Sequence, residues 1–131
     1  MKQLAEKLVS IEHEVSSEKG EFSLFGLFLR EDIENKWDLV VSASWIEPDK
    51  EYALDYLAKR LQSHLQPQEL LAISRIVFVD ENSQASEAVH RAIRVEGGTA
   101  EVQDSNFFGL QIKHAYIITS KKQNVVAAMA T

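Results

Sequence analysis

The chain has 131 residues and no cysteine, and its 14 lysines and arginines stand against 20 aspartates and glutamates, a formal net charge of −6. The length suits one domain, and the apolar share of 45% excludes a disordered or collagen-like chain. The lack of cysteine excludes thiol catalysis, cysteine-ligated zinc and iron–sulfur clusters, and the acidic balance disfavours a nucleic-acid partner. No apolar run is long enough for a membrane span, and we expect a cytoplasmic protein without membrane contact.

Residues 1–19 have the pattern of an amphipathic helix. Its apolar stripe, on one side of a 3.6-residue period, consists of Leu4, Leu8, Ile11 and Val15. The opposite, solvated face is predicted to carry Glu6, Lys7, Glu12 and Glu14. Gly20 stands where a C-cap glycine ends a helix. We expect this helix to pack on a sheet, and a short coiled-coil seam is the alternative.

Two strands are predicted at residues 22–30 and 36–44, joined as a hairpin through the polar residues 31–35. The first strand is apolar on both faces, which predicts a central strand that is covered on both sides. The second strand has a more polar face and an apolar face, the latter made of Trp37, Leu39, Val41 and Ala43.

The most regular helical pattern covers residues 48–65, where Pro48 suits the first turn. Its buried stripe is predicted to consist of Leu54, Leu57, Ala58, Leu61 and Leu65. A short helical turn at residues 68–73 and a strand at residues 75–79 follow. The next helix begins at a cap, Asn82 or Ser83, and ends before Gly97-Gly98. Its inward face is predicted to consist of Ala85, Ala88, Val89, Ala92 and Ile93.

The last two strands are predicted at residues 99–103 and 108–119, with a turn at Asp104-Ser105-Asn106. The order α-β-β-α-(α)-β-α-β-β indicates a single α+β domain over residues 1–120, a mixed, mainly antiparallel sheet of about five strands with roughly three to four helices. Residues 75–103 are expected to form a right-handed parallel crossover. Residues 121–131 have no strong pattern and are interpreted as a C-terminal tail.

Motifs of the common catalytic chemistries are absent from the sequence. The glycine pair Gly97-Gly98 follows a helix instead of preceding one, which is the wrong end for phosphate binding. The histidines are far apart, and neither HExxH nor Gly-x-Ser-x-Gly occurs, so we expect no metal and no cofactor. His114 shares a predicted strand face with Ile112 and Tyr116, where a structural role is favoured over a catalytic one.

The last hairpin offers one arrangement with a catalytic interpretation. Asp104 ends the first strand, and Gln111 and Lys113 point the same way on the next one, with His114 beside them. This pattern resembles the metal-binding core of PD-(D/E)xK nucleases, in which carboxylates hold Mg²⁺ and the lysine orients the attacking water. Gln111 departs from that pattern, because the family has an acid there. A polar turn with a solvent-facing Gln/Lys pair is the structural alternative.

A binding surface is predicted between the second strand and the long helix. Trp37 and Trp45 are eight residues apart and would share a face of an unbroken strand. Glu47, Asp49 and Glu51 would form an acidic lip beside them, and Trp is frequent at interface hot spots. Core packing of the tryptophans and stabilisation of a helix N-terminus by the acids are the alternatives.

These patterns favour a small non-enzymatic protein that binds another protein or a second copy of itself. Its predicted binding residues are Trp37, Trp45, Glu47 and Asp49. One alternative is a divalent-metal-dependent, nuclease-like enzyme that uses Asp104, Gln111 and Lys113. Another is a sensor domain with a small-molecule pocket, whose ligand the sequence does not indicate.

Overall fold

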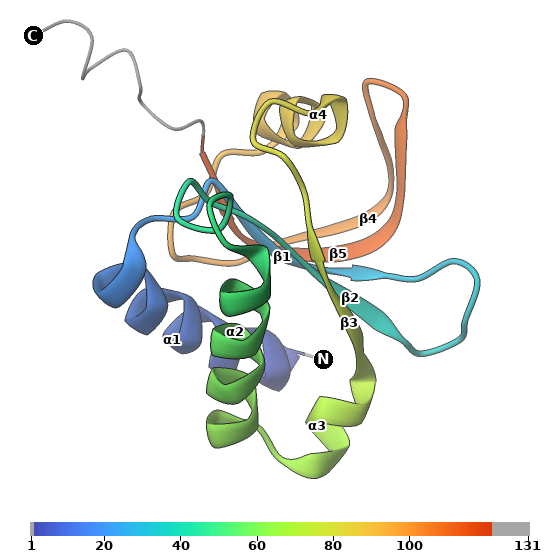
Figure 1. The fold of residues 1–131 in the computed structure, drawn as a ribbon. Helices are drawn as coiled ribbons and strands as arrows, with labels where there is room; N and C mark the ends of the chain where they lie inside the picture. The colour runs from blue at the N-terminus through green and yellow to red at the C-terminus, as the bar shows by residue number, and fades with distance from the viewer. Residues whose placement is uncertain (1, 122–131) are drawn as a thin grey trace, which may run out of the picture.

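The computed structural model describes residues 2–121, and this part of the chain has its elements in the expected order (Figure 1). The helices are α1 (Lys2–Lys19), α2 (Lys50–His64), α3 (Pro67–Ala72) and α4 (Gln84–Ala92). The strands are β1 (Leu24–Leu29), β2 (Trp37–Ser42), β3 (Ile73–Phe78), β4 (Ala100–Phe107) and β5 (Leu110–Ser120). The α+β prediction is confirmed. Of the predicted tail at residues 121–131, all but Lys121 lies outside the described residues.

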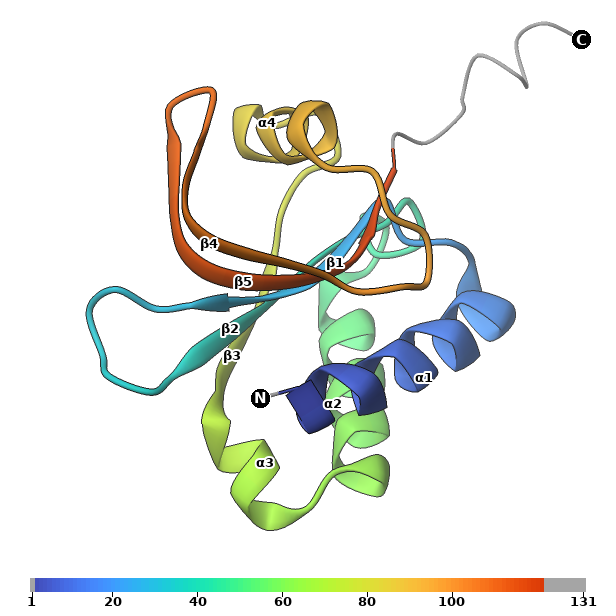
Figure 2. The ribbon, with the colours of Figure 1, turned by 180° about the vertical axis from the view of Figure 1, so that it is seen from behind.

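The strands form a mixed, five-stranded sheet in the order β3-β2-β1-β5-β4, in which only β2 and β3 are parallel. The sheet is the middle of three layers, with α1 and α2 on one face and α4 on the other (Figure 2). β1 is the central strand, as its two apolar faces predict, and it forms the predicted hairpin with β2.

The parallel pair in the sheet is connected through α2 and α3. The predicted parallel crossover over residues 75–103 is therefore wrong, because β3 and β4 lie at opposite edges of the sheet. Strands that are apolar on both faces take the positions with cover on both sides. β1 and β5 meet this condition, and together they separate the parallel pair β2 and β3 from β4.

Two apolar cores lie on opposite faces of the sheet. The main core fills the space between the sheet and the helices α1 and α2, and among its buried members are Leu8, Ile11, Phe25, Leu39 and Leu57. The α4 core, on the other face, consists of Leu24, Val89, Val102, Ile112, Ala115 and Ile117. Each strand of the hairpin β1–β2 thus contributes alternate residues to opposite sides.

α1 buries its predicted stripe in the main core, together with one residue that was predicted to be solvated. The prediction for Glu12 is wrong, because this residue is only 5% exposed. Glu12 follows Ile11 and lies one turn beyond Leu8, so it borders the apolar stripe. The hydroxyl group of Thr119 on β5 donates a hydrogen bond to its carboxyl group, which makes this position tolerable for an acid.

α2 begins after an aspartate cap and not at the proline. The carboxylate of Asp49 accepts a hydrogen bond from the backbone N–H of Tyr52 at 3.0 Å, so Pro48 precedes the cap. Its buried residues are Ala53, Leu57 and Leu61. Leu54 was predicted in this stripe but is 45% exposed, because a stripe that starts at Ala53 leaves its neighbour outside.

α4 begins at Ser83, one of the two predicted caps, whose hydroxyl group accepts a hydrogen bond from the N–H of Ser86. Its buried residues are Ser86, Ala88, Val89 and His90. The predicted inward positions Ala85 and Ala92 are exposed. Two polar contacts explain why α4 is rotated about its axis relative to the predicted orientation. Ser86 donates to the carbonyl of Asp80, and the His90 ring lies 3.0 Å from the hydroxyl group of Ser120.

The β4–β5 hairpin turns at Phe108–Gly109 and not at the predicted residues 104–106. Both turn residues have positive φ angles, 52° and 95°, as a type I′ turn requires. The side chain of Asn106 supports this turn by accepting the Gly109 N–H at 2.7 Å. Asp104 lies inside β4 with a φ of 45°. The hairpin arches toward α4 (Figure 2).

β5 does not keep the single alternation that its sequence predicts. Ile112 lies in the α4 core, whereas Tyr116 and Ile118 lie in the main core. The pairing with β1 also shifts by one residue between Ile117 and Thr119, which is a β-bulge. As a result Thr119 contacts α1 and its neighbour Ser120 contacts α4.

Candidate functional site

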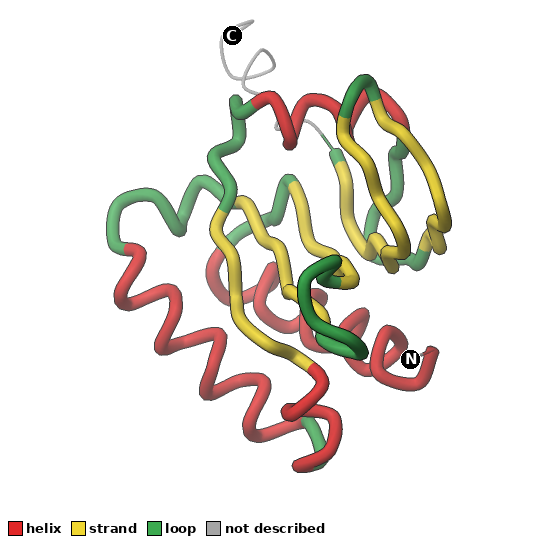
Figure 3. Tube along the Cα trace, turned by 90° about the vertical axis from the view of Figure 1, so that its right-hand side faces the viewer, coloured by secondary structure: helices red, strands yellow, loops and turns green. Residues whose placement is uncertain are grey.

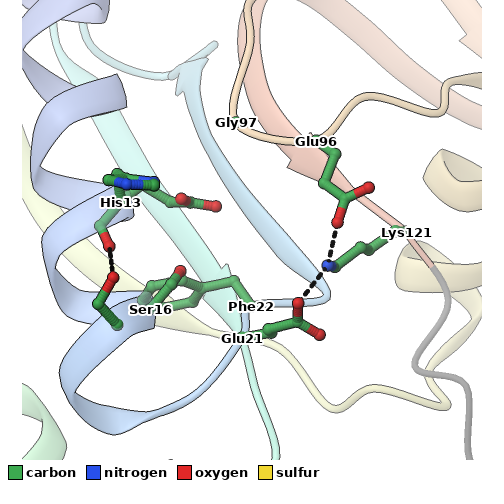
Figure 4. A pocket seen from close by; sticks show the side chains of 9 residues that line it. His13, Ser16, Glu21, Phe22, Glu96, Gly97 and Lys121 are labelled. Atoms are coloured by element: carbon green, nitrogen blue, oxygen red, sulfur yellow. Dashed lines mark hydrogen bonds and ion pairs between the residues drawn. The ribbon is translucent and has the colours of Figure 1, made fainter.

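A polar cleft of about 400 Å³ lies between α1, the end of β5 and the loop that follows α4. Figure 4 shows His13 and Ser16 of α1 on one side, and Glu96 with Lys121 on the other. The segments that meet here are far apart in the sequence. The bulge in β5 and the turn after α1 bring them together, which makes the cleft a product of the tertiary fold.

Glu12 lines this cleft and is held by a short chain of hydrogen bonds. The backbone N–H of Gly97 donates to the hydroxyl oxygen of Thr119 at 3.1 Å. The same hydroxyl group donates its proton to Glu12. Because a hydroxyl group has one proton, the bond from Gly97 fixes the direction in which Thr119 donates. The carboxyl group of Glu12 is therefore anchored at one oxygen.

Lys121 closes the opposite side of the cleft. Its Nζ lies 3.0 Å from Glu21 Oε1 and 2.5 Å from Glu96 Oε1, which joins the turn after α1 to the loop after α4 (Figure 4). Partial burial alone would lower the pKa of Lys121, but the hydrogen bonds to Glu96 and Glu21 outweigh it and raise this pKa. Among the described residues that line the cleft, three are glutamates and one is a lysine, which favours a positively charged ligand.

A second feature is an aromatic face on the end of α1, the loop before α2 and α2 itself. We define it by Lys19, Trp45, Tyr52, Tyr56 and Arg60. The rings of Tyr52 and Tyr56 stack with centroids 6.0 Å apart, and Trp45 meets Tyr56 edge to face at 6.0 Å. Lys19 Nζ lies over both tyrosines, 4.7 Å from the centroid of Tyr52 and 5.0 Å from that of Tyr56.

An ionic network holds the aromatic face in place. Arg60 contacts Glu14 at 3.0 Å and Glu18 at 2.8 Å, and its guanidinium carbon lies 5.2 Å from the centre of the Tyr56 ring. The Tyr56 hydroxyl group donates to Glu18 at 3.1 Å. The hydrogen bonds from Arg60 and then Tyr56 lower the pKa of the Glu18 carboxyl group. Tyr56 is therefore positioned from two sides.

A third cluster joins two residues that the sequence singled out separately. The indole of Trp37 meets the His114 ring edge to face, with centroids 5.1 Å apart. His114 Nε2 lies 2.9 Å from Glu101 Oε2 on the neighbouring strand, and this hydrogen bond lowers the pKa of Glu101. Burial, together with the nearby charge of Glu101, raises the pKa of Tyr116. His114 is partly buried in this cluster.

The other residues of the nuclease-like interpretation are spread along the β4–β5 hairpin. Asp104 and Lys113 lie between the paired residues Gln103–His114 and Ser105–Ile112, but they are not themselves a pair of the β4–β5 register. Gln111 pairs with Asn106, close to the turn. Lys113 lines a separate hollow beside the β1–β2 loop. Within residues 2–121, no group of three or more His, Asp or Glu side chains is arranged to hold a metal ion.

The four predicted binding residues do not form one surface. β2 ends at Ser42, so Trp45 lies beyond the strand, where its ring contacts Phe22 at 5.9 Å. Trp37, at the other end of β2, belongs to the cluster of His114. Asp49 caps α2, and Glu47 lies 3.9 Å from Lys50 in an i,i+3 pair.

Sequence reasoning missed Glu12, Thr119 and the two tyrosines. The i,i+4 spacing of Tyr52 and Tyr56 was a usable signal, because such residues are neighbours on a helix. Glu12 also carried a weak signal through its place beside Ile11. For Thr119 there was none, since a bulge decides which way its side chain points.

Comparison of the chain with models of known protein families gives no match, and comparisons with curated proteins and with solved structures also give none. Among residues 2–121, no helix is long and apolar enough to cross a membrane.

Proposed function

We propose that this protein is a non-enzymatic interaction module that binds a protein partner through the aromatic face. The observation that carries the proposal is the exposure of Tyr52, 46%, in a stacked pair with Tyr56. Trp, Tyr and Arg supply most of the binding energy at protein interfaces, and the aromatic face contains all three residue types.

The organisation of these side chains supports the same proposal. Association costs free energy when flexible side chains become ordered, so side chains that are already held bind at lower cost. Tyr56 is held by Glu18 and Arg60, and Tyr52 stacks on Tyr56. The aromatic face thus presents rigid rings with little ordering left to occur.

The charges indicate the kind of partner. Lys19 forms no ion pair with a carboxylate among the described residues, whereas Arg60 is paired with two glutamates. A partner that places a carboxylate beside Lys19 and an apolar side chain on Tyr52 would satisfy both groups. The partner is another protein, or a second copy of this chain that offers one of its many surface acids.

The proposal is tested with Tyr52→Ser in an affinity capture from a lysate of the source cells, quantified by mass spectrometry. We expect the partner bound by the unchanged protein to be depleted about tenfold, since losing a hot-spot ring weakens binding by roughly 1.4 kcal/mol or more. Sedimentation velocity of the purified protein, with and without the substitution, tests the second copy as the partner.

The matched control is Leu54→Ser. Leu54 lies on the same helix and is 45% exposed, against 46% for Tyr52, but it is outside the aromatic face. Capture should be unchanged in this variant. Equal capture by Tyr52→Ser and the unchanged protein, combined with an unchanged sedimentation coefficient, contradicts the proposal.

A further inference from the structure

Glu12 lines the polar cleft although only 5% of the residue is exposed. None of the described lysines, arginines or histidines forms an ion pair with it. The nearest cation of the cleft, Lys121, is engaged by Glu21 and Glu96. An acid that is buried without a counter-charge is costly, and such a site favours a cation.

The carboxylate of Glu12 keeps hydrogen-bond acceptor sites that its protein partner does not use. A carboxylate accepts about four hydrogen bonds. Thr119 supplies one of them, and no other protein donor to Glu12 is found among the described residues. The remaining acceptor sites belong to a group that lines the open cleft, which makes them available to a ligand with several N–H donors.

We infer that the polar cleft binds a small organic cation, an alkylammonium group whose N–H donors meet the carboxylate of Glu12. The volume of about 400 Å³ suits a small ligand. Among the described residues that line the cleft, the glutamates 12, 21 and 96 outnumber Lys121, which favours cations over anions.

A bare metal ion fits the site less well than an ammonium group. A divalent cation needs several oxygen ligands at once, and residues 2–121 contain no such group of acids and histidines. An ammonium group, by contrast, is satisfied by one carboxylate and neighbouring hydroxyl groups. Ser16 lines the cleft and carries such a hydroxyl group. The site shares no side chain with the aromatic face, and the inference is independent of the proposed function.

The inference is tested by titrating the ¹⁵N-labelled full chain with n-butylammonium chloride and following backbone amide shifts. Saturable shifts are expected at His13, Ser16 and Gly97, which line the cleft. Neutral n-butanol and sodium chloride at matched ionic strength should produce no saturable shifts there. A parallel titration with Nα-acetyl-lysine methylamide distinguishes the sources, since tighter binding of this probe indicates a lysine side chain and tighter binding of butylammonium indicates a free amine.

Glu12→Gln keeps the shape of the side chain and an oxygen that accepts from Thr119. This variant should bind butylammonium about tenfold or more weakly, the difference that corresponds to roughly 1.4 kcal/mol. Glu6→Gln, an exposed acid of the same helix outside the cleft, is the matched control and should bind as the unchanged protein does.

If Glu12→Gln does not fold, Glu96→Gln replaces it, because the Glu96 side chain is 70% exposed and Lys121 keeps Glu21 as a partner. Binding should then weaken by roughly twofold to fivefold, as expected for the loss of one solvent-screened charge at the mouth. Equal binding by the tested variant and the unchanged protein overturns the inference, as does equal binding of butanol and butylammonium.

Discussion

The two faces of the sheet are filled very differently. Within the described chain, nineteen buried apolar residues form the main core under α1 and α2, whereas six form the α4 core. On the α4 face an apolar hollow of about 230 Å³ stays open between the sheet, the short helix and the arched hairpin. Its walls include Phe28, Val77 and Leu110. Apolar residues on both faces of a strand thus predict cover on both sides, but not equal depth of burial.

The difference follows from the helices that the sequence provides. α1 and α2 have 18 and 15 residues, and each presents a continuous apolar stripe. α4 has nine residues and turns two polar side chains, Ser86 and His90, inward. A short helix with a partly polar inner face covers less of the sheet, so we expect most of the folding free energy to come from the main core.

Substitutions on the central strand test this comparison with the largest expected effect. Phe25 is fully buried in the main core, and Phe25→Ala should lower the free energy of unfolding by about 3–5 kcal/mol. Phe28, three residues along β1, faces the hollow and is only partly buried. Phe28→Ala should lower the free energy of unfolding by roughly 1–2 kcal/mol, because the Phe28 ring is partly exposed and its removal loses less buried apolar surface.

Urea-induced unfolding, followed by tryptophan fluorescence, measures both values. The two substitutions are chemically identical and lie on the same strand, so strand propensity cancels in the comparison. Equal losses of stability for Phe25→Ala and Phe28→Ala would contradict the unequal division of the two faces.

Neighbouring residues of β5 give a second test, with an intermediate effect. Thr119 contacts Glu12 on the main-core side, and Ser120 contacts His90 on the α4 side. Thr119→Val keeps the shape but leaves Glu12 and the Gly97 N–H without a partner, so we expect a loss of about 2–3 kcal/mol. Ser120→Ala removes one contact of His90 and should cost roughly 1 kcal/mol.

Both values come from urea titrations at the same pH, and Ser105→Ala in β4 is the control. Its hydroxyl group donates to Gln103 at an exposed position, and the change should be within about 0.5 kcal/mol of zero. A larger loss for Ser120→Ala than for Thr119→Val would show that the α4 face depends more on its polar contacts than the main-core face does.

The same contrast marks how far the sequence predicts this molecule. Periodicity predicts α1, the hairpin β1–β2 and the central place of β1. In each case the spacing of apolar residues indicates whether one stripe or both faces of the element are buried. It fails at the β4–β5 turn, where a polar run at residues 104–106 outweighs the Phe108–Gly109 pair that adopts positive φ. It also fails for α4, whose orientation is set by polar contacts to distant residues.

The candidate sites show a similar division. The sequence singled out Trp37, Trp45 and His114, and the structure joins Trp37 and His114 in one cluster while placing Trp45 in the aromatic face. The polar cleft could not be predicted from the sequence, because Glu12 borders an apolar stripe and a bulge positions its partner Thr119. When a register shift decides which way a side chain points, the neighbouring sequence does not indicate that direction.

The smallest expected effect is a pair of pH dependences with opposite signs. The hydrogen bond to His114 lowers the pKa of Glu101 from its ordinary 4.5, so its charged form stabilises the fold at neutral pH and this contribution is lost as pH falls through the lowered value. Glu81, in the loop before α4, has a raised pKa because of burial and the charge of Glu47. Its charged form therefore destabilises the fold at neutral pH, and protonation relieves this.

Urea unfolding at pH 7 and at pH 3 separates the two glutamates. Glu101→Gln should unfold at lower urea than the unchanged protein at pH 7, and this difference should shrink at pH 3. Glu81→Gln should unfold at higher urea at pH 7, and its advantage should also shrink on acidification, because the unchanged Glu81 is then neutral. Differences of the same sign for both variants at pH 7 would contradict the assignment. Glu101 is at the surface, so added salt should weaken its effect.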